Sequence, residues 1–346
     1  MILLTTATRS GYNWPMRGED ISLAPELVHQ GTPDKAAPGA TTVANLGPET
    51  RQALLRFAFW TAAITAVFAW PLWNLAIFSM RNSLFSHVLL IPIVSAYLVW
   101  QRPRAVALPR VTTGSAWAVV PAMLAAGLLA WYWFGLRSQG PLPLGDFLSL
   151  MTTAYLGFVL SAALVCLGPG MVKAFQFPVL FLAFMIPWPS VMVDAVETAL
   201  QYGSAEAAHA FLVLSGLPVL RDGLVFRLPG ITLEVAQECS GIRSSLVLLI
   251  TSVLAAHLLL RTRWRRWALV LAVIPLGIAR NGFRILTLSL LCVHVDTAMI
   301  DSPIHHSGGP IFFVLSLIPF FLFLLWLRHA ESRRLKAADA ASSPSP

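Results

Sequence analysis

The chain has 346 residues, of which 57% are hydrophobic and only 12% are charged, with a mean hydropathy of +0.71. Soluble domains carry roughly a quarter charged residues, so this composition excludes an ordinary soluble protein and predicts an all-α polytopic membrane protein. The net charge of +8 does not indicate nucleic-acid binding, because the basic residues cluster at the ends of apolar runs, as membrane insertion produces. The three cysteines are widely spaced and suggest neither a metal site nor a disulfide framework, and we expect no cofactor.

The first 50 residues mix glycine, proline, threonine and scattered charges without periodicity. This pattern predicts a disordered cytoplasmic tail over residues 1–50. The apolar run from Met1 to Leu4 is too short for a signal peptide, and Met1 and Met16 are both candidate starts. We expect a transmembrane domain over residues 51–328 and a basic cytoplasmic tail over residues 329–346.

Apolar runs in the rest of the chain predict about eight transmembrane helices. The first should break near Trp70-Pro71, and prolines 178, 187 and 189 should kink the far half of the fifth. The predicted spans cover residues 54–78, 86–100, 114–136, 147–168, 172–193, 240–260, 267–291 and 309–327.

The segment between the fifth and sixth spans has a different character. From Val193 to Leu214, apolar residues recur at helical spacing with acidic residues and a histidine between them, which predicts a helix lying in the membrane interface. From Gly223 to Ala236, two short alternating runs surround Pro229-Gly230, which predicts a small hairpin. Both elements should be extracytoplasmic and should lead the chain to Cys239.

The basic residues predict the orientation of the chain. The densest basic clusters, at 261–266 and 328–336, should be cytoplasmic, and the arginines on either side of the first two spans agree with this. Eight spans then place both termini in the cytoplasm. We expect the protein to lie in the inner (cytoplasmic) membrane. The 22 residues from Cys239 to Arg261 correspond to about 33 Å of helix, so Cys239 should lie at the outer surface.

Two further polar residues should reach the same outer face. Arg284 lies about 27 Å along the seventh span from Arg266, and His305 precedes the eighth span, whose far end is cytoplasmic. A thiol, a guanidinium and an imidazole from three separate segments therefore converge on one face, which indicates a shared site. Chance placement is the alternative, because loops and helix ends collect polar residues in any case.

Cys239 stands where a strand-like segment ends and a long apolar helix begins. The unpaired N–H groups at a helix start, together with Arg243 four residues later, favour the thiolate. A histidine can act as the base for a cysteine nucleophile, and an arginine can stabilise the oxyanion of acyl transfer. A packing role is the alternative, and it is the interpretation we adopt for Cys166 and Cys292.

The polar neighbours of this trio have more than one interpretation. An arginine inside an apolar helix requires a partner or a role, so we assign Arg284 to the site and Arg280 to a buried ion pair with Glu234 or Glu238. Glu238 either holds an imidazole or an arginine in place or is a solvated acid.

His305 and His306 are adjacent, so one of them can take part in catalysis while the other is only a residue of the loop. The remaining four histidines lack a matching context, and we assign them to packing, capping or solvation. They are His87, His209, His257 and His294. Among them, His294 lies nearest the predicted outer face.

Three motifs resemble those of a known family. The segments Glu238-Cys-Ser-Gly-Ile-Arg243, Asn281-Gly-Phe-Arg284-Ile and His305-His-Ser-Gly-Gly309 look like the three signature blocks of the exosortase/archaeosortase family, and Phe85-Ser-His-Val-Leu-Leu-Ile-Pro92 resembles an earlier block. The resemblance covers about residues 55–328. It is specific because the blocks occur in order and at the expected topological positions.

The resemblance implies a membrane cysteine protease and transpeptidase. Its partner would be a secreted precursor with a C-terminal signal made of a short Pro-Glu-Pro-like motif, one transmembrane helix and a basic tail. Carried over by position, Cys239 is the nucleophile, and Arg284 and His305 complete the triad, since counting back from Gly309 favours His305 over His306. The candidate supporting residues are Glu238, Arg243, Arg280, Asn281 and His306.

The acceptor for the cleaved precursor would be a membrane lipid, a glycan group or water. The tail over residues 1–50 lies outside the family core, and the sequence shows no added C-terminal domain, so we expect no coupled polysaccharide export. Two alternatives come from other classes: a transporter or flippase whose intramembrane arginines line the path of a lipid-linked anionic glycan, and a scaffold for envelope assembly.

Overall fold

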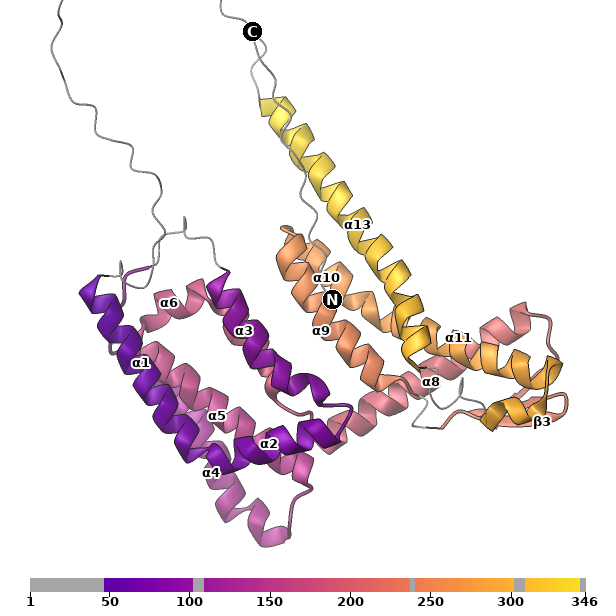
Figure 1. The fold of residues 1–346 in the computed structure, drawn as a ribbon, viewed down its shortest axis with the longest axis horizontal. Coiled ribbons are helices and arrows are strands. Elements are labelled where there is room, and N and C mark those ends of the chain that lie inside the picture. Colours follow the sequence, from indigo (N-terminus) through magenta and orange to yellow (C-terminus); the bar gives the residue numbers. More distant parts are fainter. Residues whose placement is uncertain (1–46, 102–108, 237–239, 302–308, 343–346) are drawn as a thin grey trace, which may run out of the picture. The chain divides into compact units, whose positions relative to one another are not determined.

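The computed structural model describes residues 47–101, 109–236, 240–301 and 309–342, and its regular structure is mostly helical (Figure 1). The helices of the first half are α1 (Pro48–Val67), α2 (Ala69–Arg81), η2 (Ser86–Leu89), α3 (Leu90–Trp100), η3 (Ala116–Ala118), α4 (Val119–Phe134), η4 (Leu136–Gln139), α5 (Leu144–Cys166), α6 (Gly168–Ala174), α7 (Gln176–Phe181) and η5 (Leu182–Met185). The second half contains α8 (Ser190–Leu214), β1 (Leu220–Asp222), β2 (Val225–Leu228), β3 (Ile231–Glu234), α9 (Ile242–Leu259), α10 (Arg263–Leu271), α11 (Val273–His294), η7 (Thr297–Asp301) and α13 (Gly309–Ser342).

All eight apolar runs predicted from the sequence fall on helices, but not all of them are long enough to cross a membrane. Within the described residues, five helical segments have the length and hydropathy of a span, and the number rises to seven if two sharply bent pairs each count as one. The run at Ser86–Trp100 forms a shorter apolar helix of about 22 Å, less than the thickness of a hydrocarbon core. The predicted fold class is confirmed, with five to seven spans in place of about eight.

Two of the predicted spans are bent. α1 and α2 meet at 73° around Phe68, and the pair of helices on either side of Phe175 meets at 76°. The predicted break near Trp70-Pro71 is therefore confirmed but lies slightly upstream. Pro71 and Pro178 each fall in the first turn of the helix after the bend, where the missing N–H has no intrahelical acceptor.

The fifth predicted span ends earlier than expected, and α8 begins earlier. The helical chain stops at Met185, and α8 begins at Ser190 with Pro189 at its N-cap, instead of one span continuing to residue 193. Two of the three prolines predicted to kink the span, Pro187 and Pro189, lie between these elements and separate them, because proline disfavours continuation of a helix. α8 has 25 residues but is not among the helices apolar enough to span a membrane, as the prediction of an interfacial helix requires.

The predicted hairpin is part of a three-stranded antiparallel sheet in the order β1-β2-β3. Two-residue turns connect the strands, and each contains a glycine with positive φ, Gly223 at 61° and Gly230 at 82°. β1 was not predicted, because its three residues are too few to show alternation. The sheet packs on α8 through Phe226, which is fully buried.

An ion pair ties the edge of this sheet to α8. The Arg221 guanidinium donates to a Glu206 carboxylate oxygen at 2.7 Å. This hydrogen bond holds the pKa of Glu206 below its ordinary value and raises that of Arg221. The acid predicted on the polar face of the interfacial helix therefore anchors the sheet.

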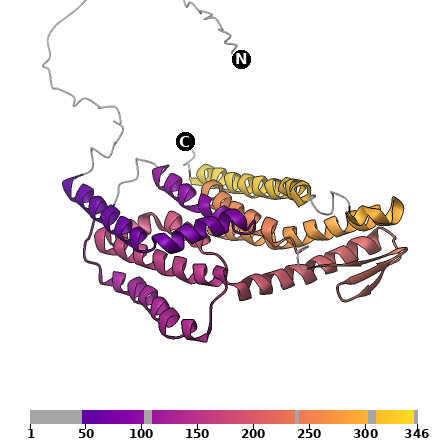
Figure 2. The ribbon, with the colours of Figure 1, turned by 60° about the horizontal axis from the view of Figure 1, so that its bottom comes forward.

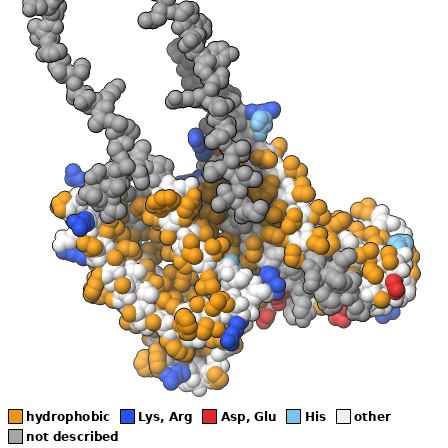
Figure 3. Space-filling model, in the orientation of Figure 1, with side chains coloured by type: hydrophobic (Ala, Val, Ile, Leu, Met, Phe, Trp, Pro, Cys, Tyr) orange, Lys and Arg blue, Asp and Glu red, His pale blue; other side chains and the backbone are white. Residues whose placement is uncertain are grey.

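Buried apolar clusters hold the helices together. One cluster joins α2, α3, α5 and α7, and another joins α9, α10, α11 and α13. α9 connects the two groups, because Ile250 and Leu254 pack against the first cluster while Leu248 and Ala256 belong to the second. The surface in view is largely covered by hydrophobic side chains, as lipid contact requires (Figure 3).

α8 and α11 lie side by side in both ribbon views (Figure 2). A Cβ added at Gly282 of α11 would come within 2.7 Å of the Ala207 Cβ, and one added at Gly203 of α8 would come within 3.0 Å of Ile278 Cδ1. At Gly282 the backbone of α8 approaches this closely, so only glycine fits there, whereas at Gly203 the neighbouring atoms belong to the Ile278 side chain. This contact holds α11 against the element that leads to the sheet.

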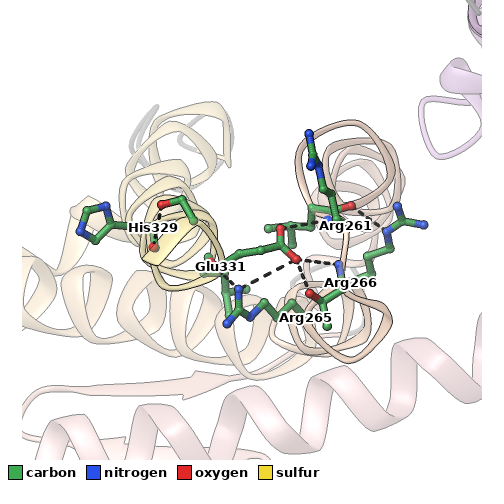
Figure 4. Close-up of polar contacts among 9 residues, drawn as sticks. Arg261, Arg265, Arg266, His329 and Glu331 are labelled. Atoms are coloured by element: carbon green, nitrogen blue, oxygen red, sulfur yellow. Dashed lines mark hydrogen bonds and ion pairs between the residues drawn. The ribbon is translucent and has the colours of Figure 1, made fainter. Parts of the chain in front are cut away.

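A buried acid joins α13 to the turn between α9 and α10 (Figure 4). The Glu331 carboxylate accepts hydrogen bonds from the Arg261 N–H at 3.0 Å and from the N–H and hydroxyl of Thr262. Arg265 Nη1 lies 3.9 Å from the same carboxylate and donates to the Leu327 carbonyl. The N-terminus of α10 is thereby fixed to α13.

Candidate functional site

A cavity of about 860 Å³, lined by both charged and apolar side chains, lies where the starts of several helices meet. Its walls come from the turn after α2 and from the beginnings of α5, α8, α9 and α13, and Arg284 of α11 also contributes. In Figure 1 the beginnings of α9 and α13 lie beside α11. Segments far apart in the sequence therefore share one cavity.

The segment before α9 is positioned by the sheet and by α8. Val235, directly after β3, is buried, and its carbonyl accepts a hydrogen bond from Gln201 Nε2 of α8 at 2.5 Å. After residues 237–239, the chain continues at Ser240, which is buried at 2% exposure, and at Gly241, the N-cap of α9. The chain on either side of the predicted nucleophile is thus held in place.

Gly241 has a conformation and surroundings that only glycine fits. Its φ is +73°, and a Cβ there would lie 2.9 Å from Arg280 Nη2. Its carbonyl accepts hydrogen bonds from the Ser245 N–H at 3.0 Å, from Ser244 Oγ at 3.0 Å and from Arg280 Nη2 at 3.2 Å. The start of α9 is therefore bonded to α11.

Arg280 is the α11 side of this contact. Its guanidinium is 8% exposed and also donates to Ser245 Oγ at 3.3 Å, while its Nη1 has no hydrogen-bond partner among the described residues. The ion pair expected with Glu234 is not seen, and Glu238, the other expected partner, lies outside the described residues. Among the described residues, the Gly241 carbonyl and the Ser245 hydroxyl accept hydrogen bonds from Arg280.

Arg284 is one turn further along α11 and lines the cavity. It is half-buried, and Asn281 beside it is buried at 2% exposure. Arg243 of α9 lines the same cavity and is exposed. Two guanidinium groups therefore face a space in which an oxyanion or a carboxylate could be stabilised.

The other predicted site residues fall outside the described residues. These are Cys239, Glu238, His305 and His306. Their described neighbours, Ser240 on one side and Gly309 on the other, both line the cavity with Arg284.

Three acids of the cavity were not predicted as site residues: Asp146, Asp194 and Glu197. Asp146 lies in the first turn of α5, at the predicted outer end of the fourth span, so the orientation argument that placed Cys239 outside could have found it. Its carboxylate accepts hydrogen bonds from the Ser190 N–H at 2.6 Å and from Ser190 Oγ at 2.8 Å, which caps α8. Within the described part of the chain, no group of three His, Cys, Asp or Glu residues could hold a metal ion.

The close approach at Gly241 gives a testable prediction. Gly241→Ala should destabilise the protein by about 1–2 kcal/mol through its positive φ, and by about 1–3 kcal/mol more through contact with the Arg280 guanidinium. Gly216→Ala is the matched control, because Gly216 has a φ of +76° but open space around its Cβ position. Thermal unfolding of the purified proteins measures both, and equal losses would show that the Arg280 contact contributes nothing.

Several long apolar helices define the class of the molecule: it is a multi-pass membrane protein. The chain belongs to the transmembrane exosortase family, because the family model described as Transmembrane exosortase matches residues 72–322. Membership implies a membrane protein that processes C-terminal sorting signals of the PEP-CTERM type, in a family generally considered to be transpeptidases. The searches of curated proteins and of solved structures each gave no match.

Proposed function

We propose that the chain is a cysteine transpeptidase that cleaves the C-terminal sorting signal of secreted precursors through a thioacyl intermediate. Cys239 is the nucleophile, Arg284 stabilises negative charge, and His305 transfers the proton. The observation that carries the proposal is the single cavity lined by Ser240, Arg284 and Gly309, which are close in sequence to, or part of, all three signature motifs.

The start of α9 supports the choice of nucleophile. Cys239 directly precedes Ser240 and Gly241, and the 18-residue helix that follows directs its N-terminal dipole toward this end. Arg243 on the first turn of α9 adds positive charge at the cavity. Both features favour a thiolate over a thiol at this position.

The reaction then proceeds in two steps, acylation of Cys239 and transfer of the acyl group to an acceptor. The thiolate of Cys239 attacks the carbonyl carbon of the scissile peptide bond, Arg284 stabilises the oxyanion, and His305 gives a proton to the leaving nitrogen as the C–N bond breaks. The products are a thioester on the enzyme and a released C-terminal fragment. An acceptor hydroxyl or amine, or water, attacks the thioester, loses its proton to the imidazole and restores the thiolate.

The substrate's own anchor accounts for its delivery to the cavity. A precursor held in the bilayer by a C-terminal helix presents the residues before that helix at the membrane surface, where the starts of α5, α8, α9 and α13 meet. A cavity of about 860 Å³ is within the usual size range of ligand sites.

The proposed orientation places both chain ends in the cytoplasm and the cavity outside. The 18 residues of α9 correspond to about 27 Å, and the basic run at 261–266 follows its far end. A membrane-impermeant maleimide added to spheroplasts is expected to label Cys239 but not Cys166 and Cys292, which are 4% and 2% exposed. Labelling that requires lysis would place the cavity on the cytoplasmic side.

Trapping the intermediate tests the proposed chemistry directly. Purified full-length protein is mixed with a labelled precursor and quenched in acid, and we expect a covalent adduct that neutral hydroxylamine releases. The Cys239→Ser variant can form only an oxygen ester, so any adduct it gives should resist hydroxylamine, and Cys239→Ala should give none. Cleavage by the wild-type protein without an adduct, or an adduct that forms on Cys239→Ala, would contradict the thioacyl mechanism.

The transporter alternative makes the opposite prediction. If the chain is a transporter, substitution of Arg280 or Arg284 should reduce its activity, whereas the Cys239→Ser variant should stay fully active. The cavity favours it less, because Asp146, Asp194 and Glu197 face the same space as the arginines and would repel an anionic glycan.

A further inference from the structure

A second cavity, of about 960 Å³, lies at the other end of α9. Its walls come from the end of α3, from α6 and α7, from the last turns of α9 and from α10. The hydroxyl of Ser95 on α3 donates to the Pro178 carbonyl of α7 at 2.8 Å, which fixes two of these walls to each other. The residues of this cavity are separate from those of the first one.

The charges around the second cavity have one sign. Lys173, Arg263 and Arg266 line it, and the described lining residues include no carboxylate. Arg266 donates through Nε to the Leu260 carbonyl at 2.8 Å rather than to Glu331 (Figure 4). Glu331, the acid that pairs with Arg265 of α10, is already bonded to Arg261 and Thr262. Three cations around one space repel each other, and a bound anion would relieve that repulsion.

The other walls are apolar and aromatic. The His257 ring of α9 stacks parallel on the Phe177 ring of α7 with centroids 3.5 Å apart, and Leu98 and Val253 line the cavity nearby. Trp267 of α10 lines it as well and is 66% exposed, a position typical of a tryptophan at the boundary between lipid and water. The cavity therefore combines a cationic rim with apolar walls.

We propose that this second cavity binds the phosphate headgroup of an anionic phospholipid, with the glycerol and upper acyl chains against the apolar walls. Basic pockets between membrane helices at the cytoplasmic side bind such headgroups, and the basic residues 261–266 mark this end of the protein as cytoplasmic. The basic tail of a sorting signal does not fit, because three cations would repel it. The inference does not depend on the proposed peptidase chemistry.

Native mass spectrometry of the full-length protein in detergent tests this inference. Phosphatidylglycerol and phosphatidylcholine with the same acyl chains are titrated separately, and we expect the anionic lipid to bind about tenfold more tightly. The variant Lys173→Gln with Arg263→Gln should lose that preference, so that the two lipids bind it about equally. Equal binding of the two lipids to the wild-type protein would overturn the proposal.

Two control variants separate the cavity from charge in general. Arg333→Gln with Arg334→Gln removes the same charge from exposed positions on α13 that do not line the cavity, so it should keep the preference. Lys173→Arg with Arg263→Lys keeps the charge and should also keep it. If the first control loses the preference as fully as the cavity variant, binding is a property of the basic end and the site is wrong.

A competition experiment identifies the source of the phosphate. Glycerol 3-phosphate carries the same headgroup phosphate without acyl chains, and we expect it to displace phosphatidylglycerol only at concentrations more than about a hundredfold higher, because it lacks the apolar contacts. Displacement at equal concentration would mean that the cavity takes a soluble phosphate, and the lipid assignment would fail.

Discussion

Replacing Cys239 by alanine is expected to reduce precursor processing to background, a loss of at least about 10⁴-fold in rate. Removal of the nucleophile leaves only the catalysis supplied by oxyanion stabilisation and binding, which is small for enzymes that use a covalent intermediate. The prediction is specific to Cys239 because this residue directly precedes Ser240, and Ser240 and Arg284 line the same cavity. A water-mediated or scaffolding mechanism would tolerate the change.

The measurement is the ratio of trimmed to full-length precursor in cells that co-express a secreted protein with the C-terminal signal, namely the short motif, the transmembrane helix and the basic tail. Cys166→Ala and Cys292→Ala are the controls, since both thiols are buried in helices away from the cavity and should affect packing alone. These two variants should process normally, provided that their abundance in the membrane matches that of the wild-type protein. Normal trimming by Cys239→Ala would show that the nucleophile has been assigned wrongly.

The helical framework could be predicted because long apolar runs carry a strong signal. Every predicted span falls on a helix, since a chain in lipid must satisfy its backbone groups within each segment. The bends were harder to locate. Proline at 71 and at 178 indicated a break, but the helix after each bend includes the proline in its first turn, so the break lies upstream of it.

The sheet and the start of α8 show where local patterns are insufficient. β1 has three residues, and its pairing with β2 depends on the Gly223 turn and on burial of Phe226 against α8, which are tertiary contacts. The start of α8 at Ser190 depends on the Asp146 carboxylate, 44 residues earlier in the chain. A sequence pattern cannot show which distant side chain will cap a helix.

The cavity could be predicted in part. Orientation by basic residues placed Arg284 with the segments around Cys239 and His305, and Ser240, Arg284 and Gly309 do line one cavity. The predicted Arg280–Glu234 ion pair is not seen, while Glu238, the other predicted partner, lies outside the described residues. Gly241 leaves room for the guanidinium and presents a carbonyl to it, so a backbone oxygen takes the place expected for Glu234. Charge complementarity alone favoured the carboxylate.

The two arginines of α11 should respond differently to the same substitution. Arg284→Gln is expected to slow processing by about 10²–10³-fold, because removal of one oxyanion donor has an effect of that size in acyl-transfer enzymes. Arg280→Gln should lower the free energy of unfolding by about 1–3 kcal/mol, because it leaves the partly buried Gly241 carbonyl and Ser245 hydroxyl with one partner fewer. Arg280→Gln should reduce precursor processing only indirectly, because the start of α9 would be displaced.

Single-turnover kinetics and thermal unfolding of the same purified proteins separate these roles. For Arg284→Gln, the rate constant for cleavage of a bound precursor should fall while the midpoint of unfolding changes less than it does for Arg280→Gln. Arg284→Lys keeps the charge but loses the planar guanidinium, so it should recover part of the rate. An Arg284→Gln protein that cleaves bound precursor at the wild-type rate would remove this arginine from the chemical step, and an Arg280→Gln protein of unchanged stability would show that the hydrogen bond to Gly241 does not hold the start of α9 in place.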